Sequence, residues 1–290
     1  MTVQTHPHTT PDLRLAARQG LLPARGESWL AGFSNMLAKE LGEWFRTRRW
    51  LWQILIWVTM INGFMALLLF VLPALASIMP ELKPTVEAVF SGQPPEVGGV
   101  MMYFAIAVMA GTIGAIILAQ DEIIQEKQSG TAAWILSKPA ARPAFILTKL
   151  LSNTIGVLVF IVALPALVTL GQVFLATHKL VPLAPFLAGE GVFLLALFFY
   201  LSLVIMLGVL FESRGPALGI AFGVVFGGMI IGSLIPPINY VLPVSMDRIA
   251  QVIMLGIPLP AMFVSQLIAS AVLSIVFILV ALWHFQHIEL

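Results

Sequence analysis

Residues 185–211 read PFLAGEGVFLLALFFYLSLVIMLGVLF, and the only charged side chain in this stretch, Glu190, lies near its beginning. An α-helix needs about 20 apolar residues to cross a hydrocarbon core of about 30 Å, because each residue adds about 1.5 Å along the helix axis. The stretch is long enough for such a crossing and too apolar for the surface of a soluble domain. It therefore predicts a transmembrane helix.

Other stretches of the chain have the same character. Apolar runs long enough for a membrane span occupy about residues 50–72, 98–119, 150–177, 217–235 and 261–283. Pro73 predicts the end of the first span, and Pro165 predicts a kink in the third, since proline removes a hydrogen bond from a helix and clashes with the preceding turn. The sequence thus predicts an all-α polytopic membrane protein with six transmembrane helices.

Composition agrees with this fold class. Of the 290 residues 59% are hydrophobic and 10% are charged, whereas a soluble domain carries about 25% charged residues. A soluble enzyme and a disordered chain are excluded. The formal net charge of +1 excludes a nucleic-acid-binding protein that works by bulk positive charge, and the absence of cysteine excludes disulfides, thiolate metal sites and a cysteine nucleophile.

The distribution of basic residues predicts the orientation in the membrane. Twelve of the 15 Lys and Arg residues fall on one side of the predicted spans, and cytoplasmic segments are the ones that retain such residues. The tryptophans gather near the same side, where their rings favour the membrane interface. We therefore expect an integral, multi-pass protein of a bacterial or archaeal plasma membrane, with both termini in the cytoplasm.

Three regions are expected along the chain. Residues 1–27 lack periodicity and predict a flexible cytoplasmic tail. Residues 28–49 place apolar side chains at helical spacing opposite charged ones, which predicts an interfacial amphipathic helix. This helix is either a lipid anchor or a docking surface for a cytosolic protein. The six-span domain occupies residues 50–290.

The six-span domain includes two long connecting segments. The outer one, 236–260, contains an apolar piece at about 247–257 that either re-enters the membrane or forms a surface loop. The inner one, 120–149, includes an acidic turn, a glycine that permits a break, and a short apolar helix around Trp134 that ends before Pro139. An exposed apolar patch at that position suggests contact with lipid or with a groove on another protein.

The inner segment resembles the loop between the second and third spans of ABC type-2 exporter permeases. In that family an acidic residue, Gly-Thr, an apolar turn, Leu-Ser-x-Pro, an Arg and a Lys follow one another, and here the corresponding positions are Glu126, Gly130, Thr131, Leu136, Ser137, Pro139, Arg142 and Lys149. The overall layout over about residues 29–287 is similar as well. The chain departs from the pattern at Ala132 and Ala133, where many relatives carry an acidic residue.

The resemblance implies a complex of two permease subunits, identical or different, with two cytosolic ATP-binding cassette ATPases. This chain has no phosphate-binding loop of its own, because no Lys is followed by Ser or Thr, so ATP and magnesium are expected in the partner and no cofactor on this chain. We expect no catalytic residue and no metal site here. The residues expected to couple the permease to its ATPase are Glu122, Glu126, Gly130, Thr131, Trp134, Pro139, Arg142, Lys149, Glu212 and Arg214.

Two alternatives to an exporter stay open. An ion-coupled carrier needs ionisable groups inside the membrane, and Glu190 alone falls within a predicted span, so this function is disfavoured. A non-transporting membrane scaffold that recruits a partner through the inner segment is the other alternative. Lipid is an expected partner in each case, and nucleic acid is not.

Small and polar residues within the spans complete the predictions. Glycines recur every fourth residue in the fifth span, and such rows allow helices to approach closely. They predict packing within the bundle, or a face toward the second permease subunit or the translocation path; the rows are Gly219, Gly223 and Gly227, and Gly228 and Gly232. Asn62 is interpreted as the source of an interhelical hydrogen bond in preference to a substrate contact.

Overall fold

The structure, a computed structural model, describes residues 29–90, 92–120, 122–137 and 140–288, and all regular structure within them is helical. Six of the described helical segments are long and apolar enough to cross a membrane. The predicted all-α fold with six spanning helices is therefore confirmed. The spans are α3 to α5 (Arg49–Ile78), α7 (Pro95–Ala119) continued by α8 (Glu122–Gln128), α10 to α11 (Arg142–Thr177), α12 (Leu183–Leu210), α13 to α14 (Arg214–Leu234) and α16 (Ala261–His287).

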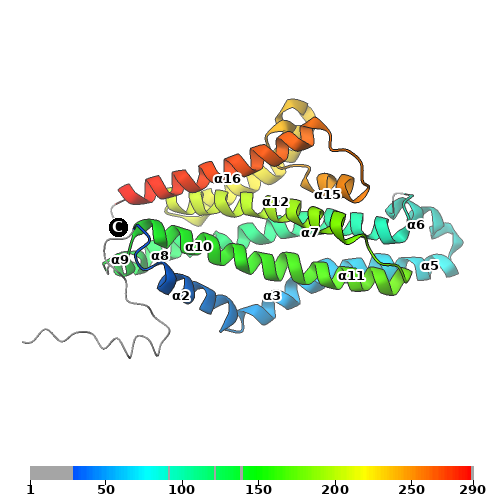
Figure 1. The fold of residues 1–290 in the computed structure, drawn as a ribbon, viewed down its shortest axis with the longest axis horizontal. Helices are drawn as coiled ribbons and strands as arrows, with labels where there is room; N and C mark the ends of the chain where they lie inside the picture. Colours follow the sequence, from blue (N-terminus) through cyan, green and yellow to red (C-terminus); the bar gives the residue numbers. More distant parts are fainter. Residues whose placement is uncertain (1–28, 91, 121, 138–139, 289–290) are drawn as a thin grey trace, which may run out of the picture.

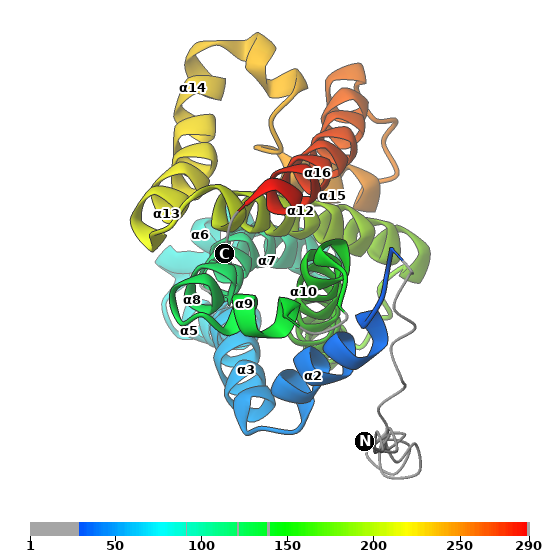
Figure 2. The ribbon, with the colours of Figure 1, turned by 90° about the vertical axis from the view of Figure 1, so that its left-hand side faces the viewer.

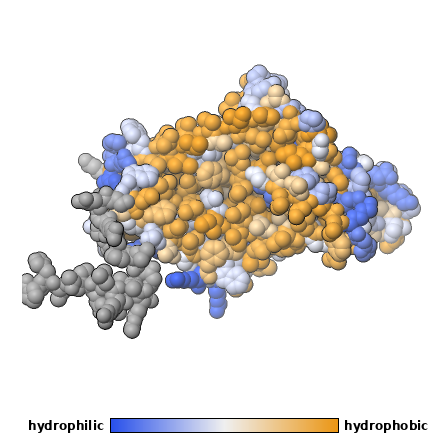
Figure 3. Space-filling model, in the orientation of Figure 1, coloured by the Kyte–Doolittle hydropathy of each residue, from blue (hydrophilic) through white to orange (hydrophobic). Residues whose placement is uncertain are grey.

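The spans run side by side along the long axis of the molecule (Figure 1). We call the end at which α8 lies and α16 ends the inner end, and the end at α5 and α6 (Lys83–Val89) the outer end. A band of hydrophobic side chains covers the middle of the visible face, and hydrophilic residues gather toward the two ends (Figure 3). This surface is that of an integral, multi-pass membrane protein.

Two prolines in the interior of spans are accommodated by widened helical turns. Pro73 lies in α5 (Leu72–Ile78), directly after the π-helical turn η2 (Leu67–Val71), and the first span continues beyond it. Pro165 similarly follows the π-helical turn η4 (Leu158–Ala163). A π-turn moves the carbonyl that the proline ring would otherwise hit, so helices in membranes tolerate proline in this way. The prediction that the first span ends at Pro73 was wrong for this reason.

The third span begins earlier than the hydropathy pattern predicts. Helix α10 (Arg142–Val157) starts at Arg142, and its first turns bury Ala144, Phe145 and Ile146. The inner segment consists of α8, the short helix α9 (Thr131–Leu136) and the beginning of α10. Charged residues near the end of a span were assigned to a loop because hydropathy does not register helices that extend beyond the hydrocarbon core.

Helix α12 occupies the centre of the bundle. Of the residues in its most apolar stretch 78% are buried, against 28% in the corresponding stretch of the fifth span and 22% in that of α16. Figure 2 shows α13 (Arg214–Phe222), α14 (Gly228–Leu234) and α16 on one side of α12, with α10 and α3 (Arg49–Trp57) on the other. The fifth and sixth spans therefore leave much apolar surface on that side of the molecule.

The amphipathic helix α2 (Phe33–Phe45) packs against the inner part of the third span. Trp44 is fully buried there, and its ring stacks on Phe160 with centroids 5.6 Å apart. Gly156 makes room for the indole, since a Cβ at this position would lie 2.5 Å from Trp44 Cε2. The predicted tail, residues 1–27, lies outside the described residues.

The outer segment contains the helix α15 (Met246–Met254), which folds back onto α7 and α12. Four of its apolar side chains are buried, and Gln251 donates a hydrogen bond to the carbonyl of Met101 (3.1 Å). The apolar piece predicted at about 247–257 therefore packs on the bundle as a helix through Met254 and is not a surface loop. That it enters the hydrocarbon core stays a prediction.

Candidate functional site

Lys149 is the centre of a buried cluster of charges at the inner end. The side chain of this α10 residue is 3% exposed, and its Nζ lies 3.2 Å from Oε1 of Glu40 in α2 and 3.2 Å from Oε1 of Glu126 in α8. A buried ammonium group is tolerated only when carboxylates or other acceptors replace its water. The contact therefore fastens three helices to one another.

Lys39 extends this cluster toward the surface. Its Nζ lies 3.1 Å from Glu126 Oε1, 3.5 Å from Glu40 Oε1 and 3.7 Å from Glu43 Oε1. Burial lowers the pKa of Lys39, but the neighbouring carboxylates of Glu126 and Glu40 outweigh this effect and raise the pKa above its usual value. We call Lys39, Glu40, Glu126 and Lys149 the inner network.

A second polar contact joins α8 to its neighbours. Asn153 of α10 donates a hydrogen bond from Nδ2 to Glu122 Oε2 (2.5 Å), and Arg49 Nη2 lies 3.6 Å from Glu122 Oε1. The Arg49 guanidinium also lies over the ring of Trp44, 4.2 Å from its centroid, which is a cation–π arrangement. Helix α8 is thus bound to the first and third spans and, through Arg49, to the end of α2.

Lys127 binds α8 to the inner end of α12. Its Nζ donates to the carbonyl oxygens of Val209 (3.0 Å) and Phe211 (3.0 Å), and Gln128 Nε2 donates to the carbonyl of Glu212 (2.7 Å). The last carbonyls of a helix have no partner within it and carry partial negative charge. Lys127 therefore acts as a capping group from a different helix.

Arg142 makes the equivalent contact with the inner end of α16. Its Nη1 donates to the carbonyl oxygens of Phe285 (3.2 Å), Gln286 (2.9 Å) and Ile288 (2.8 Å). The ring of Phe145 stacks on that of Phe285 with centroids 5.2 Å apart. The inner segment is thus connected to the ends of both α12 and α16.

The remaining residues predicted to couple to an ATPase lie on the surface near these contacts. Gly130 separates α8 from α9 with φ +71°, a conformation that favours glycine. Thr131 begins α9 and Trp134, 62% exposed, lies on it. Glu212 and Arg214 are exposed in the connection that Gln128 contacts. Pro139 lies outside the described residues.

The predicted residues thus divide into two groups. Glu122, Glu126 and Lys149 point into the protein, so their contribution to any coupling passes through α2 and α10 and not through direct contact with a partner. Trp134 and Arg214 face outward.

No role was predicted from the sequence for Lys39 and Glu40 of the inner network, nor for Lys127 and Asn153. The charged face of α2 could have indicated the role of Lys39 and Glu40, because charged residues require partners where a helix packs on the bundle.

The two glycine rows of the fifth span have different surroundings. A Cβ added at Gly219, Gly223 or Gly227 would meet nothing within 4 Å, so this row lies on the open surface of the described structure. A Cβ at Gly228 would lie 3.0 Å from Val244 Cγ1, and one at Gly232 would collide with the side chain of Asn239. The second row therefore lets the outer segment pack closely against the fifth span.

Asn62 makes interhelical contacts within the bundle. Its Nδ2 donates to Thr169 Oγ1 (2.7 Å) and to the backbone carbonyl of Pro165 (3.0 Å). The backbone carbonyl of Asn62 accepts from Gln172 Nε2 (2.9 Å). The geometry favours the interhelical interpretation. Contact with a substrate stays a prediction.

Much of the chain matches a known family of protein sequences. The family model described as "Protein of unknown function (DUF2705)" matches residues 88–290. The chain belongs to the DUF2705 family. The part shared with DUF2705 runs from the end of α6 to α16 and so includes Lys127, Arg142 and Lys149, while α2 and the first span precede it. No curated protein matches the chain.

Proposed function

We propose that the chain is the permease subunit of an ATP-binding cassette exporter. The observation that carries this proposal is the set of bonds from one short inner segment to three other elements: Lys127 to α12, Arg142 to α16, and Glu126 and Lys149, through the inner network, to α2. Because each of these contacts joins the segment to another helix at the inner end, a displacement of the segment would shift the inner ends of several helices together. The resemblance of the same segment to exporter permeases supports this function.

The proposed partners follow from the exposed part of the segment. A cytosolic ATPase with its ATP and magnesium would bind α9 in a groove, with Trp134 as its principal apolar contact. Glu212 and Arg214 lie close enough to α8 to belong to the same docking surface. The complex would contain a second permease subunit and lie in a plasma membrane, with both termini in the cytoplasm as the basic residues predict.

Copurification tests the proposal. The tagged chain, extracted in a mild detergent, is expected to bring along an ATPase that is identified by mass spectrometry and by ATP hydrolysis. Trp134→Ala is expected to weaken this association by about 30-fold, because a buried tryptophan at the centre of an interface commonly contributes about 2 kcal/mol or more. The matched control is Trp283→Ala, which removes a tryptophan of similar exposure, 64%, from the inner part of α16.

Two results would count against the exporter. One is the absence of any ATPase from the wild-type preparation under conditions in which the chain elutes as a homogeneous species. The other is an equal loss of ATPase from both tryptophan variants, since that would indicate a general surface effect and not docking at α9.

One observation favours an ion-coupled carrier as a second candidate. Glu190 is 7% exposed within α12, and neither of its carboxylate oxygens has a hydrogen-bond partner. Tyr103 is the polar neighbour of this carboxyl group, and its hydroxyl has no hydrogen-bond partner either. Buried, unpartnered acids within membranes are candidate ion sites.

Reconstitution distinguishes the two functions. Vesicles that contain the chain alone and a pH-sensitive dye are expected to show no proton flux if the chain is a permease that depends on an ATPase. Proton flux that Glu190→Gln abolishes would favour the carrier.

A further inference from the structure

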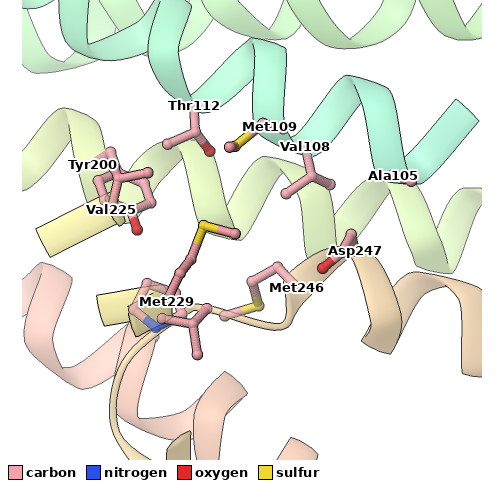
Figure 4. A pocket seen from close by; sticks show the side chains of 11 residues that line it. Ala105, Val108, Met109, Thr112, Tyr200, Val225, Met229, Met246 and Asp247 are labelled. Atoms are coloured by element: carbon pink, nitrogen blue, oxygen red, sulfur yellow. The ribbon is translucent and has the colours of Figure 1, made fainter. Parts of the chain in front are cut away.

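A second site lies away from the inner end, in a cavity of about 220 Å³ between α7, α12, α14 and α15. Figure 4 shows the side chains around it. Among them are Met109, Met229 and Met246, whose thioethers lie near its middle. Met229 is 49% exposed, so the cavity reaches the surface of the bundle. Ligand sites in proteins are commonly such concave, mostly apolar spaces with a few convergent polar groups.

The cavity has polar groups that the protein itself does not use. Thr112 and Tyr200 are both buried, yet among the described residues their hydroxyls take part in no hydrogen bond. In Figure 4 these two hydroxyls lie toward one end of the cavity and Asp247 lies toward the other. A ligand that fills the space would meet apolar walls with polar groups at both ends.

Asp247 gives the cavity its charge. The charge of Arg248 and the backbone N–H groups of Arg248 and Asp247 act on its carboxyl group, but none of the ion pairs found among the described residues includes it. Desolvated carboxylates favour a positively charged partner. The side chain also lies in the first turn of α15, where an acid stabilises a helix, but that role explains neither the cavity nor the two hydroxyls.

We propose that this cavity binds an amphipathic organic cation, with its ammonium group near Asp247 and its apolar body against the methionines and the ring of Tyr200. Methionine side chains are flexible and polarisable, and they suit ligands of varied shape. The ring of Tyr200 offers a large apolar face to the body of such a ligand. Binding at this site requires no ATPase. That the bound cation is a transported cargo rests on the proposed exporter function.

Binding to the purified full-length chain in a nonionic detergent tests the proposal. The probes are benzyltrimethylammonium and its neutral isostere neopentylbenzene, which have the same shape and differ in charge. We expect calorimetry or equilibrium dialysis to detect the cation and to show at least about 10-fold weaker binding of the isostere, because the charge of Asp247 attracts only the cation. Asp247→Asn is expected to remove this preference.

Two further variants complete the experiment. Glu81→Gln removes an exposed acid from the same outer end and is expected to leave binding unchanged. Met229→Trp narrows the cavity from its exposed side and is expected to weaken binding of the cation even if Asp247→Asn does not fold. Elution as a single species in size-exclusion chromatography shows which variants are folded.

The proposal is overturned if wild-type protein binds the cation and the isostere equally, or if neither folded variant of the cavity weakens binding. Absence of any ATPase from the wild-type preparation, with cation binding retained, would refute the exporter and leave this site intact.

Discussion

Replacing Lys149 by Met tests whether the inner network holds the inner end together. The substitution keeps the length and apolar stem of the side chain and removes its charge. It leaves Glu40 and Glu126 facing each other without the cation that lies 3.2 Å from both. Removing one partner of a buried ion pair costs about 3–5 kcal/mol.

Lys39 reduces this cost, because its Nζ lies 3.1 Å from Glu126 and 3.5 Å from Glu40. We therefore expect a loss near the lower limit, about 3 kcal/mol in the free energy of unfolding. Equilibrium unfolding by SDS in mixed micelles, followed by tryptophan fluorescence, measures the difference.

The control is Lys179→Met at the outer end. Lys179 forms an ion pair with Glu96 at 2.7 Å, but the lysine is exposed, so its removal is expected to leave the unfolding curve unchanged. The double variant Lys149→Met with Glu40→Gln is expected to be more stable than Lys149→Met alone, since it removes one of two neighbouring carboxylates that would otherwise share Lys39. A Lys149→Met protein as stable as Lys179→Met would refute a structural role for the network.

Three other substitutions have defined outcomes. Gly156→Ala displaces the buried ring of Trp44 and is expected to destabilise the protein by about 1–3 kcal/mol in the same unfolding assay. Its control is Gly171→Ala, which is expected to be neutral because an added Cβ there meets nothing within 4 Å. Asn62→Leu removes interhelical hydrogen bonds and is expected to cost about 1 kcal/mol by that assay. Burial raises the pKa of Asp247 above 3.8, so the folded state binds its proton more tightly than the unfolded chain does, and stability falls as pH rises from 3.8 through the folded value. Asp247→Asn is expected to remove that fall in melting temperature measured against pH.

The number of spans followed directly from the sequence, because runs of apolar residues report burial in hydrocarbon whatever their neighbours are. The ends of the spans did not. Pro73 predicted a helix end, but the widened turn η2 before it allows the helix to continue. Arg142 and Lys149 were assigned to a loop, since hydropathy does not distinguish a solvated charge from one paired inside a helical bundle.

The candidate site shows the same limit at the level of side chains. Sequence patterns located the inner segment and its exposed Trp134. They gave no way to see that Glu126 belongs with Glu40, which lies far away in the chain, or that Lys127 reaches the end of α12. Such pairings depend on how α2 packs against α10, and a single sequence contains no direct record of that contact. Asp247 was likewise invisible as part of a cavity, because four separate helices form its walls.

The bond between Arg142 and the end of α16 has a consequence for synthesis of the chain. The acceptor at Phe285 lies 143 residues beyond Arg142 in the sequence, and ribosomes add about 5–20 residues per second. The guanidinium group therefore waits about 7–30 seconds for its final partner while later spans enter the membrane. During that interval the third span lacks its bond to α16, and residues 285–288 supply the acceptors. A chain that ended before Phe285 would lose this bond while keeping all but the last residues of α16.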